Sequence, residues 1–231
     1  MLTTLKNAFK IKEIRNKILF TFGMLVVIRI GSQLPVPGVN TEFFSQWFAA
    51  QTGGAFSFFD AITGGSFINM SILALNISPY ITSSIIMQLL TIAIPKLEEM
   101  QREGEDGRKK IASITRYVTV GLALIQSTAM AVGFGRQGYL IEYNVLNVIT
   151  TVVALTAGSA FLMWVGERIT DKGIGNGISV VLVINIISRI PQDLRNLFTK
   201  FVIGKAPATA ILAAVIIFAV IILTVVLVII L

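Results

Sequence analysis

Long apolar segments separated by short polar or charged segments recur along the whole chain of 231 residues. An α-helix rises about 1.5 Å per residue, so a helix of about 20 apolar residues crosses the hydrocarbon core of a bilayer. The pattern predicts six membrane-spanning helices, at about 18–34, 67–90, 114–134, 145–165, 178–189 and 207–231. We therefore expect an all-α polytopic membrane protein.

A short apolar segment, 55–62, stands between the first two predicted spans and is rich in Phe. It lies between two glycine pairs, Gly53-Gly54 and Gly64-Gly65. A helix of this length is too short to cross a bilayer, and such segments are usually re-entrant or interfacial. We expect a short re-entrant helix with flexible glycine pairs on both sides and few fixed packing partners.

The second predicted span combines many polar residues with one apolar row. Ile77, Ile81 and Ile85 follow an i, i+4 spacing and share one helix face. The row alone is compatible with packing against lipid or against another helix. Polar neighbours at membrane depth need water or protein partners, however, and they favour the wall of a pore. These neighbours are Asn69, Ser71, Asn76, Ser78, Pro79, Thr82, Ser83, Ser84 and Gln88.

The composition and charge agree with a membrane protein. Hydrophobic residues make up 55% of the chain and charged residues 13%, whereas soluble domains carry about a quarter charged residues. The net charge is +7, but the basic residues gather between spans, a pattern that indicates membrane orientation rather than nucleic-acid binding. Segments 1–17 and 96–116 hold five and six Lys or Arg residues, and 35–70 holds none. This bias predicts a cytoplasmic N-terminus, with the basic outer segment 189–205 as an exception.

Two further segments have open or competing interpretations. The charged loop 96–110 either docks a cytoplasmic partner or only fixes the topology. GIGNGIS at 173–179 imitates a dinucleotide-binding loop, but it stands between two membrane spans rather than after a strand. We expect a tight turn between two helices, with Gly and Asn supplying left-handed backbone conformations. The turn residues are Gly173, Gly175, Asn176 and Gly177.

The residue types argue against catalysis and against ion-coupled transport. The chain has no Cys and no His, so thiolate chemistry and the commonest general base are absent. Ser66 and Ser84 have no base near them in the sequence, which disfavours a membrane-embedded enzyme. No acidic residue lies in the middle of a predicted span, which disfavours half of an inverted-repeat secondary transporter. We expect no cofactor and no metal.

Three motifs make the chain resemble the SecY family, the large subunit of the bacterial Sec protein-conducting channel. They are RIGSQLPVPGV at 29–39, SILALNISPYITSSIIMQLL at 71–90 and MWVGERITDKGIGNGIS at 163–179. Asn76 departs from the pattern, since the family often has Gly there. The resemblance implies a fold of ten spans in two pseudo-symmetric halves, with a short plug helix.

The resemblance also implies the organisation of this chain. It suggests a cytoplasmic amphipathic helix at 1–17, an N-terminal half-channel at 18–199, and an outer loop end and sixth span at 200–231. The apolar run reaches Leu231 with no basic residue after it, and we expect a fragment of a longer protein. The implied pore ring is Ile77, Ile81, Ile178 and Leu182. The implied plug contains Ala55, Phe56, Phe58, Phe59, Ile62, Gly64 and Gly65, with Gly53 and Gly54 as its hinges.

The function implied by the resemblance is passive protein conduction. Such a channel passes unfolded polypeptides across the bacterial plasma membrane and releases membrane-protein segments sideways into the lipid. The SecA motor or the ribosome would drive it, SecE and SecG would be its small subunits, and it would not bind nucleic acid directly. A ring of Ile and Leu would seal against ions by dewetting and still widen around a polypeptide.

Overall fold

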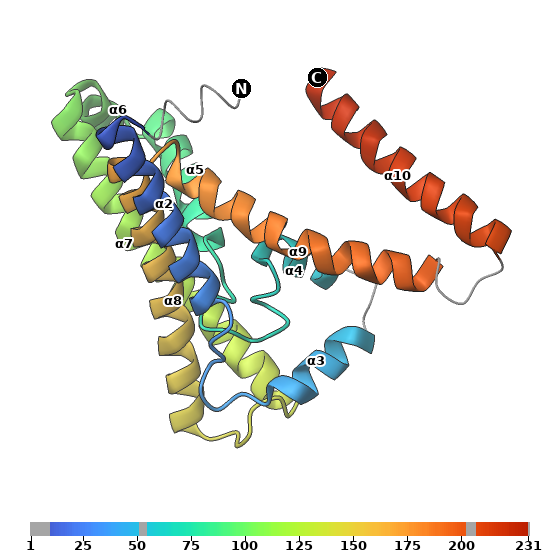
Figure 1. Cartoon of the computed structure of the whole chain (residues 1–231). Coiled ribbons are helices and arrows are strands. Elements are labelled where there is room, and N and C mark those ends of the chain that lie inside the picture. The colour runs from blue at the N-terminus through green and yellow to red at the C-terminus, as the bar shows by residue number, and fades with distance from the viewer. Residues whose placement is uncertain (1–9, 51–54, 202–206, 231) are drawn as a thin grey trace. The chain divides into compact units, whose positions relative to one another are not determined.

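A computed structural model describes residues 10–50, 55–201 and 207–230 (Figure 1). The chain forms two compact units, Met1–Ile186 and Ile187–Leu231, called unit 1 and unit 2 below. In the described ranges all extended regular elements are helices, and strand pairing is limited to two isolated bridges. The helices are α2 (Lys12–Gly31), α3 (Thr41–Ala50), α4 (Ala55–Thr63), α5 (Ser78–Ala93), α6 (Pro95–Arg102), α7 (Glu105–Arg136), α8 (Val145–Lys172), α9 (Gly177–Phe201) and α10 (Pro207–Ile230).

Three of the described helices, α7, α8 and α9, are long and apolar enough to cross a bilayer. The pair α5 and α6 also qualifies as one span if its bend of 100° is counted as a break within the membrane. The fold is thus that of an all-α, multi-pass membrane protein. The first and sixth predicted spans coincide with α2 and α10, and their crossing of the membrane stays a prediction.

The second predicted span, 67–90, is wrong in its first half. The chain is irregular from Gly64 to Ile77, and the helix begins only at Ser78, where Pro79 provides a helix-starting φ. Met70 and Asn76 adopt left-handed φ values of 42° and 54°, which interrupt any helix. Apolar periodicity alone did not reveal this break.

Hydrogen bonds to other segments stabilise the irregular backbone of 64–77. The Ile72 amide donates to the carbonyl of Leu34 at 2.9 Å, and the Val36 amide donates to the carbonyl of Met70 at 2.9 Å. Nearly every residue of the segment is buried. Non-helical backbone at membrane depth is tolerated only where protein or water satisfies it, and here protein does so.

The charged segment 96–110 is mostly helical rather than a loop. It contains α6 and the first turns of α7, because its Lys, Leu, Glu, Met, Gln and Arg residues are strong helix formers. An i, i+4 ion pair joins Glu98 and Arg102 at 2.6 Å. The fourth and fifth predicted spans are shorter than the helices that contain them. Helix α8 runs on to Lys172, and α9 continues through Pro191. Helix α2 begins at Lys12 and passes position 17 without a break.

Small residues allow α7 to pack closely in unit 1, where it lies against α5 and α8 (Figure 1). They occur at every fourth position of α7, so they form one continuous face of the helix. Helices in lipid associate through such close contacts and through hydrogen bonds, because burial of apolar surface adds little there. The buried residues are Thr115, Thr119, Ala123, Ser127, Ala131 and Gly135.

An aromatic cluster fixes α3 within unit 1. The apolar pattern of the sequence did not predict this helix. Phe44 is fully buried and makes edge-on ring contacts with Phe67, Phe134 and Tyr139 at centroid distances of 5.7, 5.0 and 5.7 Å. Each such contact contributes roughly 0.5–1.5 kcal/mol beyond the area it buries. The cluster therefore holds α3 against the irregular segment and the C-terminal end of α7.

Candidate functional site

Four apolar residues from two distant segments lie together in unit 1. Ile77 precedes α5 and Ile81 lies one turn later, while Ile178 and Leu182 lie one turn apart at the start of α9. All four belong to one hydrophobic cluster, which also contains side chains of α2 and α8 and is called the apolar cluster below. Ile85, the third residue of the predicted row, is 52% exposed and lies outside it.

The two segments of the apolar cluster meet at Gly166 of α8. A Cβ atom at Gly166 would lie 3.2 Å from Cδ1 of Ile178 and 3.4 Å from Cδ1 of Ile77. Ile77 is fully buried, whereas Ile81, Ile178 and Leu182 remain partly exposed. These three side chains are therefore available to line a passage. The role of the four residues as a pore ring stays a prediction.

The short apolar segment forms helix α4, as the sequence predicted. Phe58 is 71% exposed, while the ring of Phe59 packs edge-on against Phe67 at 5.1 Å. Ile62 is half-buried. The predicted hinges Gly53 and Gly54 lie outside the described residues, as do the side chains of Ala55 and Phe56.

The second glycine pair caps α4. The Gly65 amide donates to the carbonyl of Asp60 at 3.1 Å, and the Gly64 amide donates to that of Ala61 at 3.3 Å. With φ values of 67° and 84°, Gly64 and Gly65 thus close a Schellman motif. The pair is buried. The expectation of few packing partners is therefore wrong at this end of α4.

Asp60 lies in α4, and its side chain is fully buried. Its Oδ1 atom accepts a hydrogen bond from the Ile68 amide at 2.9 Å. The Asp60 side chain thereby stabilises the chain reversal after α4. Asp60 is the one fully buried acidic residue in the described part of the chain.

Polar groups from three other elements surround the capped end of α4. Arg29 of α2 donates to the carbonyl of Gly64 at 3.3 Å. Asn76 and Asn185 are buried beside the same turn. Asn185 was not among the predicted site residues. Its signal was present, since it is a lone carboxamide in the middle of the fifth predicted span.

The residues of GIGNGIS form a tight turn between α8 and α9, as expected. Gly175 has a φ of 73° and supplies the left-handed conformation. Asn176 was expected to do the same, but it caps α9: its Oδ1 atom accepts from the amides of Ile178 at 3.0 Å and Ser179 at 3.4 Å. Thr21 of α2 holds the turn by accepting from the Ile174 amide at 3.1 Å. The turn thus sets the start of α9, where two residues of the apolar cluster lie.

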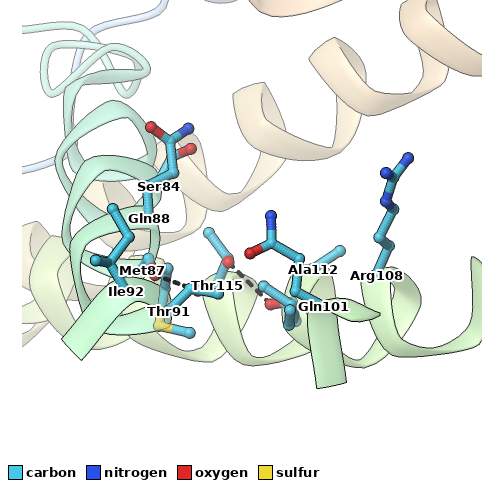
Figure 2. Close-up of a pocket in the computed structure, with 10 residues that line it drawn as sticks. Ser84, Met87, Gln88, Thr91, Ile92, Gln101, Arg108, Ala112 and Thr115 are labelled. Carbon is cyan, nitrogen blue, oxygen red and sulfur yellow. Dashed lines mark hydrogen bonds between the residues drawn. The ribbon is translucent and has the colours of Figure 1, made fainter. Parts of the chain in front are cut away.

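A partly polar pocket of about 440 Å³ lies between α5, α6 and the start of α7. Figure 2 shows Gln88 and Ser84 on one side of it and Gln101 and Arg108 on the other. Its lining mixes carboxamides, hydroxyls and methyl groups and has no arrangement typical of an acid–base pair.

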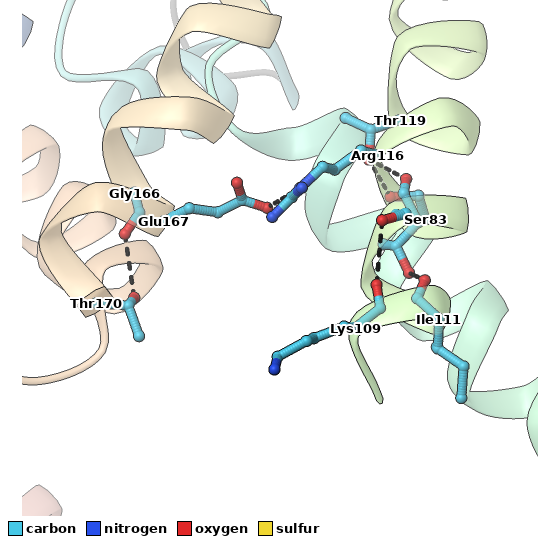
Figure 3. Close-up of polar contacts among 10 residues, drawn as sticks. Ser83, Lys109, Ile111, Arg116, Thr119, Gly166, Glu167 and Thr170 are labelled. Atoms are coloured by element: carbon cyan, nitrogen blue, oxygen red, sulfur yellow. Dashed lines mark hydrogen bonds and ion pairs between the residues drawn. The ribbon is translucent and has the colours of Figure 1, made fainter. Parts of the chain in front are cut away.

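Hydrogen bonds and one ion pair join α7 to its neighbours (Figure 3). The hydroxyl groups of Ser83 and Thr119 bond to each other between α5 and α7. Arg116 of α7 donates to Glu167 of α8 at 2.7 Å. The pair is partly exposed, so its contribution to stability is about 0–1 kcal/mol. Its clearer consequence is positional, since it fixes the register of two long helices.

Proteins that are similar to this chain in sequence include translocase subunits. A family model described as SecY matches residues 71–231. The protein translocase subunit SecY of Bacillus licheniformis is 44% identical over 204 residues, which are 87% of this chain and 47% of that protein. The Bacillus subtilis subunit is 44% identical over 207 residues, again 87% of this chain and 47% of that protein. The chain thus spans about half the length of these relatives.

Two solved structures share the fold. One is described as the structure of a protein conducting channel, and it covers 83% of this chain and 38% of its own, with a TM-score of 0.53 and 20% identity. The other is Sec61 in the canine ribosome-channel complex from the endoplasmic reticulum, with the same TM-score and identity, and it is covered over 39% of its length. At this level of identity the two structures support the architecture alone.

Proposed function

The chain belongs to the SecY family, and we propose from this premise that it forms half of the wall of a protein-conducting channel. The channel would pass unfolded secretory polypeptides across the bacterial plasma membrane and release membrane-protein segments sideways into the lipid. The Lys and Arg distribution supports a cytoplasmic N-terminus. The proposal gives this chain a passive role without catalysis.

The observation that carries the proposal is the meeting of two distant segments in the apolar cluster, next to the short capped helix α4. Ile77 and Ile81 come from one segment and Ile178 and Leu182 from another. Such side chains offer no hydrogen bonds to water or ions, so a narrow ring of them excludes ions by dewetting. They also form no directional bonds with a passing polypeptide, so polypeptides of any sequence can pass.

Helix α4 is proposed as the plug that rests against this constriction on the outer side. Its exposed Phe58 and its length of only nine residues suit a segment that moves as a unit. Asp60 is engaged with the backbone of its own turn, which argues against a role as the ion-binding carboxylate of a transporter. We therefore retain the channel over half of a secondary transporter.

The proposed partners are those of a bacterial translocon: the small subunits SecE and SecG, and SecA or the ribosome as the source of force. The charged helix α6 and the start of α7 present Glu98, Arg102 and Lys109 to the surface and provide a candidate docking face. The same charges also suit simple topology control. Binding of SecA to a variant with these charges removed distinguishes the two roles.

Complementation tests the proposal. Residues 1–231 replace the equivalent segment of the Bacillus subtilis relative, and this fusion is called the Bacillus chimera. We expect it to restore secretion of a reporter enzyme in cells depleted of their own subunit. A matched fusion carrying Leu182→Asp, which places a charge in the apolar cluster, is expected to impair it. A stable, membrane-inserted Bacillus chimera that restores no secretion would contradict the proposed function.

A further inference from the structure

A pair of buried carboxamides joins the proposed plug to both walls of the apolar cluster. Asn76 is 1% exposed and Asn185 is 2% exposed. The Nδ2 atom of Asn76 donates to the carbonyl of Ile62 in α4 at 3.2 Å. Its Oδ1 atom accepts from Nδ2 of Asn185 at 3.0 Å. One side chain thus holds α4 with its donor and α9 with its acceptor, since a carboxamide carries both groups.

Both carboxamides stand next to residues of the proposed pore ring. Asn76 directly precedes Ile77, and Asn185 lies three residues after Leu182, one turn further along α9. The hydroxyl of Ser159 in α8 fixes the backbone of Asn76 by donating to its carbonyl at 3.2 Å. A change in the separation of α9 from the 64–77 segment therefore acts directly on the bond between the two carboxamides.

The capped end of α4 is also in direct contact with α9. A Cβ atom at Gly64 would lie 2.6 Å from the backbone oxygen of Asn185, so the two backbones touch with no space for a side chain. Gly64 is the first residue of the irregular segment and directly follows the last turn of α4. The position of α4 and the position of α9 are thus linked by packing as well as by hydrogen bonds.

We infer that Asn76 and Asn185 form a latch that couples widening of the apolar cluster to release of helix α4. The inference rests on the proposed function. When α9 moves away, the bond between the two carboxamides breaks and Gly64 loses its contact with α9. The Oδ1 atom of Asn76 then stays buried without the hydrogen bond from Asn185, which costs free energy until water enters and replaces the donor. The remaining bond to Ile62 is the last polar tie of Asn76 to α4. When α9 returns, both bonds reform and α4 is seated again.

The backbone at position 76 offers a clean way to remove the latch. Asn76 has a φ of 54°, a conformation that Gly adopts without strain and that Asn tolerates better than most residues. Asn76→Gly therefore deletes both side-chain hydrogen bonds while the main chain keeps its course. Asn185→Ala removes the partner from the other side and improves local helix propensity.

The test measures release of α4 in the Bacillus chimera, reconstituted in nanodiscs so that both faces are accessible. The sequence has no Cys, so once cysteines of the relative's own part are replaced, Ser66→Cys provides a single label position that is 2% exposed while α4 is seated. The rate of reaction with a water-soluble maleimide reports the fraction of time that this turn is open. Losing one such hydrogen bond is expected to raise the rate about 3- to 10-fold for Asn185→Ala, and Asn76→Gly, which loses two, is expected to raise it further. The double variant is expected to match Asn76→Gly, because the shared bond is already absent.

A matched control separates latch loss from general destabilisation. Ser127→Ala removes a hydrogen bond between Ser127 and Thr156, which joins α7 to α8 away from α4. It is expected to lower the melting temperature without changing the labelling rate. Unchanged labelling in both Asn variants, or equal acceleration by Ser127→Ala, would overturn the latch. Failure of the Bacillus chimera to secrete would instead overturn the proposed function, since that assay does not depend on the label.

Discussion

Helix α8 lies so close to the irregular segment at Gly158 that adding one methyl group there is expected to lower the stability of the protein markedly. Gly158 of α8 is buried, and a Cβ atom there would lie 1.8 Å from the carbonyl oxygen of Ile72. A backbone atom has no rotamer with which to move aside, so Gly158→Ala must displace the whole segment. Overpacking of this kind costs about 3 kcal/mol, while the gain in helix propensity offsets about 1 kcal/mol. The net loss is about 2 kcal/mol, or roughly 4–8 °C in melting temperature for a unit of this size.

The matched control for this change is Gly121→Ala in α7. A Cβ atom at Gly121 meets nothing within 4 Å, so only the gain in helix propensity remains. We expect thermal unfolding of the Bacillus chimera in detergent, followed by Trp fluorescence, to give opposite signs for the two variants. A melting temperature for Gly158→Ala equal to or above that of Gly121→Ala would refute the close packing of α8 on the 64–77 segment.

Two further predictions concern conduction. Ile178→Gly combined with Leu182→Gly is expected to raise the ion conductance of the resting Bacillus chimera in planar bilayers, because the proposed pore ring loses two of its three partly exposed side chains. Unchanged conductance would argue against the sealing role. Residues 1–231 without the relative's C-terminal part are expected to insert but to give no gated conductance in liposomes, since polar residues of α5 would face lipid at a cost of several kcal/mol each. A monodisperse monomer with a gated pore would contradict that expectation.

The membrane class and one half of the apolar cluster could be predicted from the residue pattern, because both depend on the order of apolar residues within single segments. A run of about twenty apolar residues is typical of a membrane-spanning helix. Helices α7, α8 and α9 confirm the corresponding predicted spans by length and composition. The i, i+4 spacing of Ile77 and Ile81 placed them on one face. That Ile178 and Leu182 would join them came from family resemblance alone, since spacing within one segment says nothing about its partner.

The irregular segment could not be predicted, because its conformation depends on contacts made far along the chain. Asn76 reads as a polar residue in an apolar helix, yet it lies in a left-handed turn held by α8 and α9. Helix α3 was missed because its few Phe and Trp residues bury themselves only against α7 and the segment after α4. Helix α6 was missed because charge was given more weight than helix propensity.

Passage of a translocating polypeptide through the apolar cluster can be detected by site-specific photocrosslinking. A photoreactive amino acid replaces Leu182 in the Bacillus chimera, and a secretory polypeptide is stalled during translocation. Ile92, which is 80% exposed on α5 and lies outside the cluster, provides the control position. We expect crosslinks to the polypeptide from position 182 and not from position 92. Crosslinks from 92 alone, or none from 182 while secretion proceeds, would contradict it.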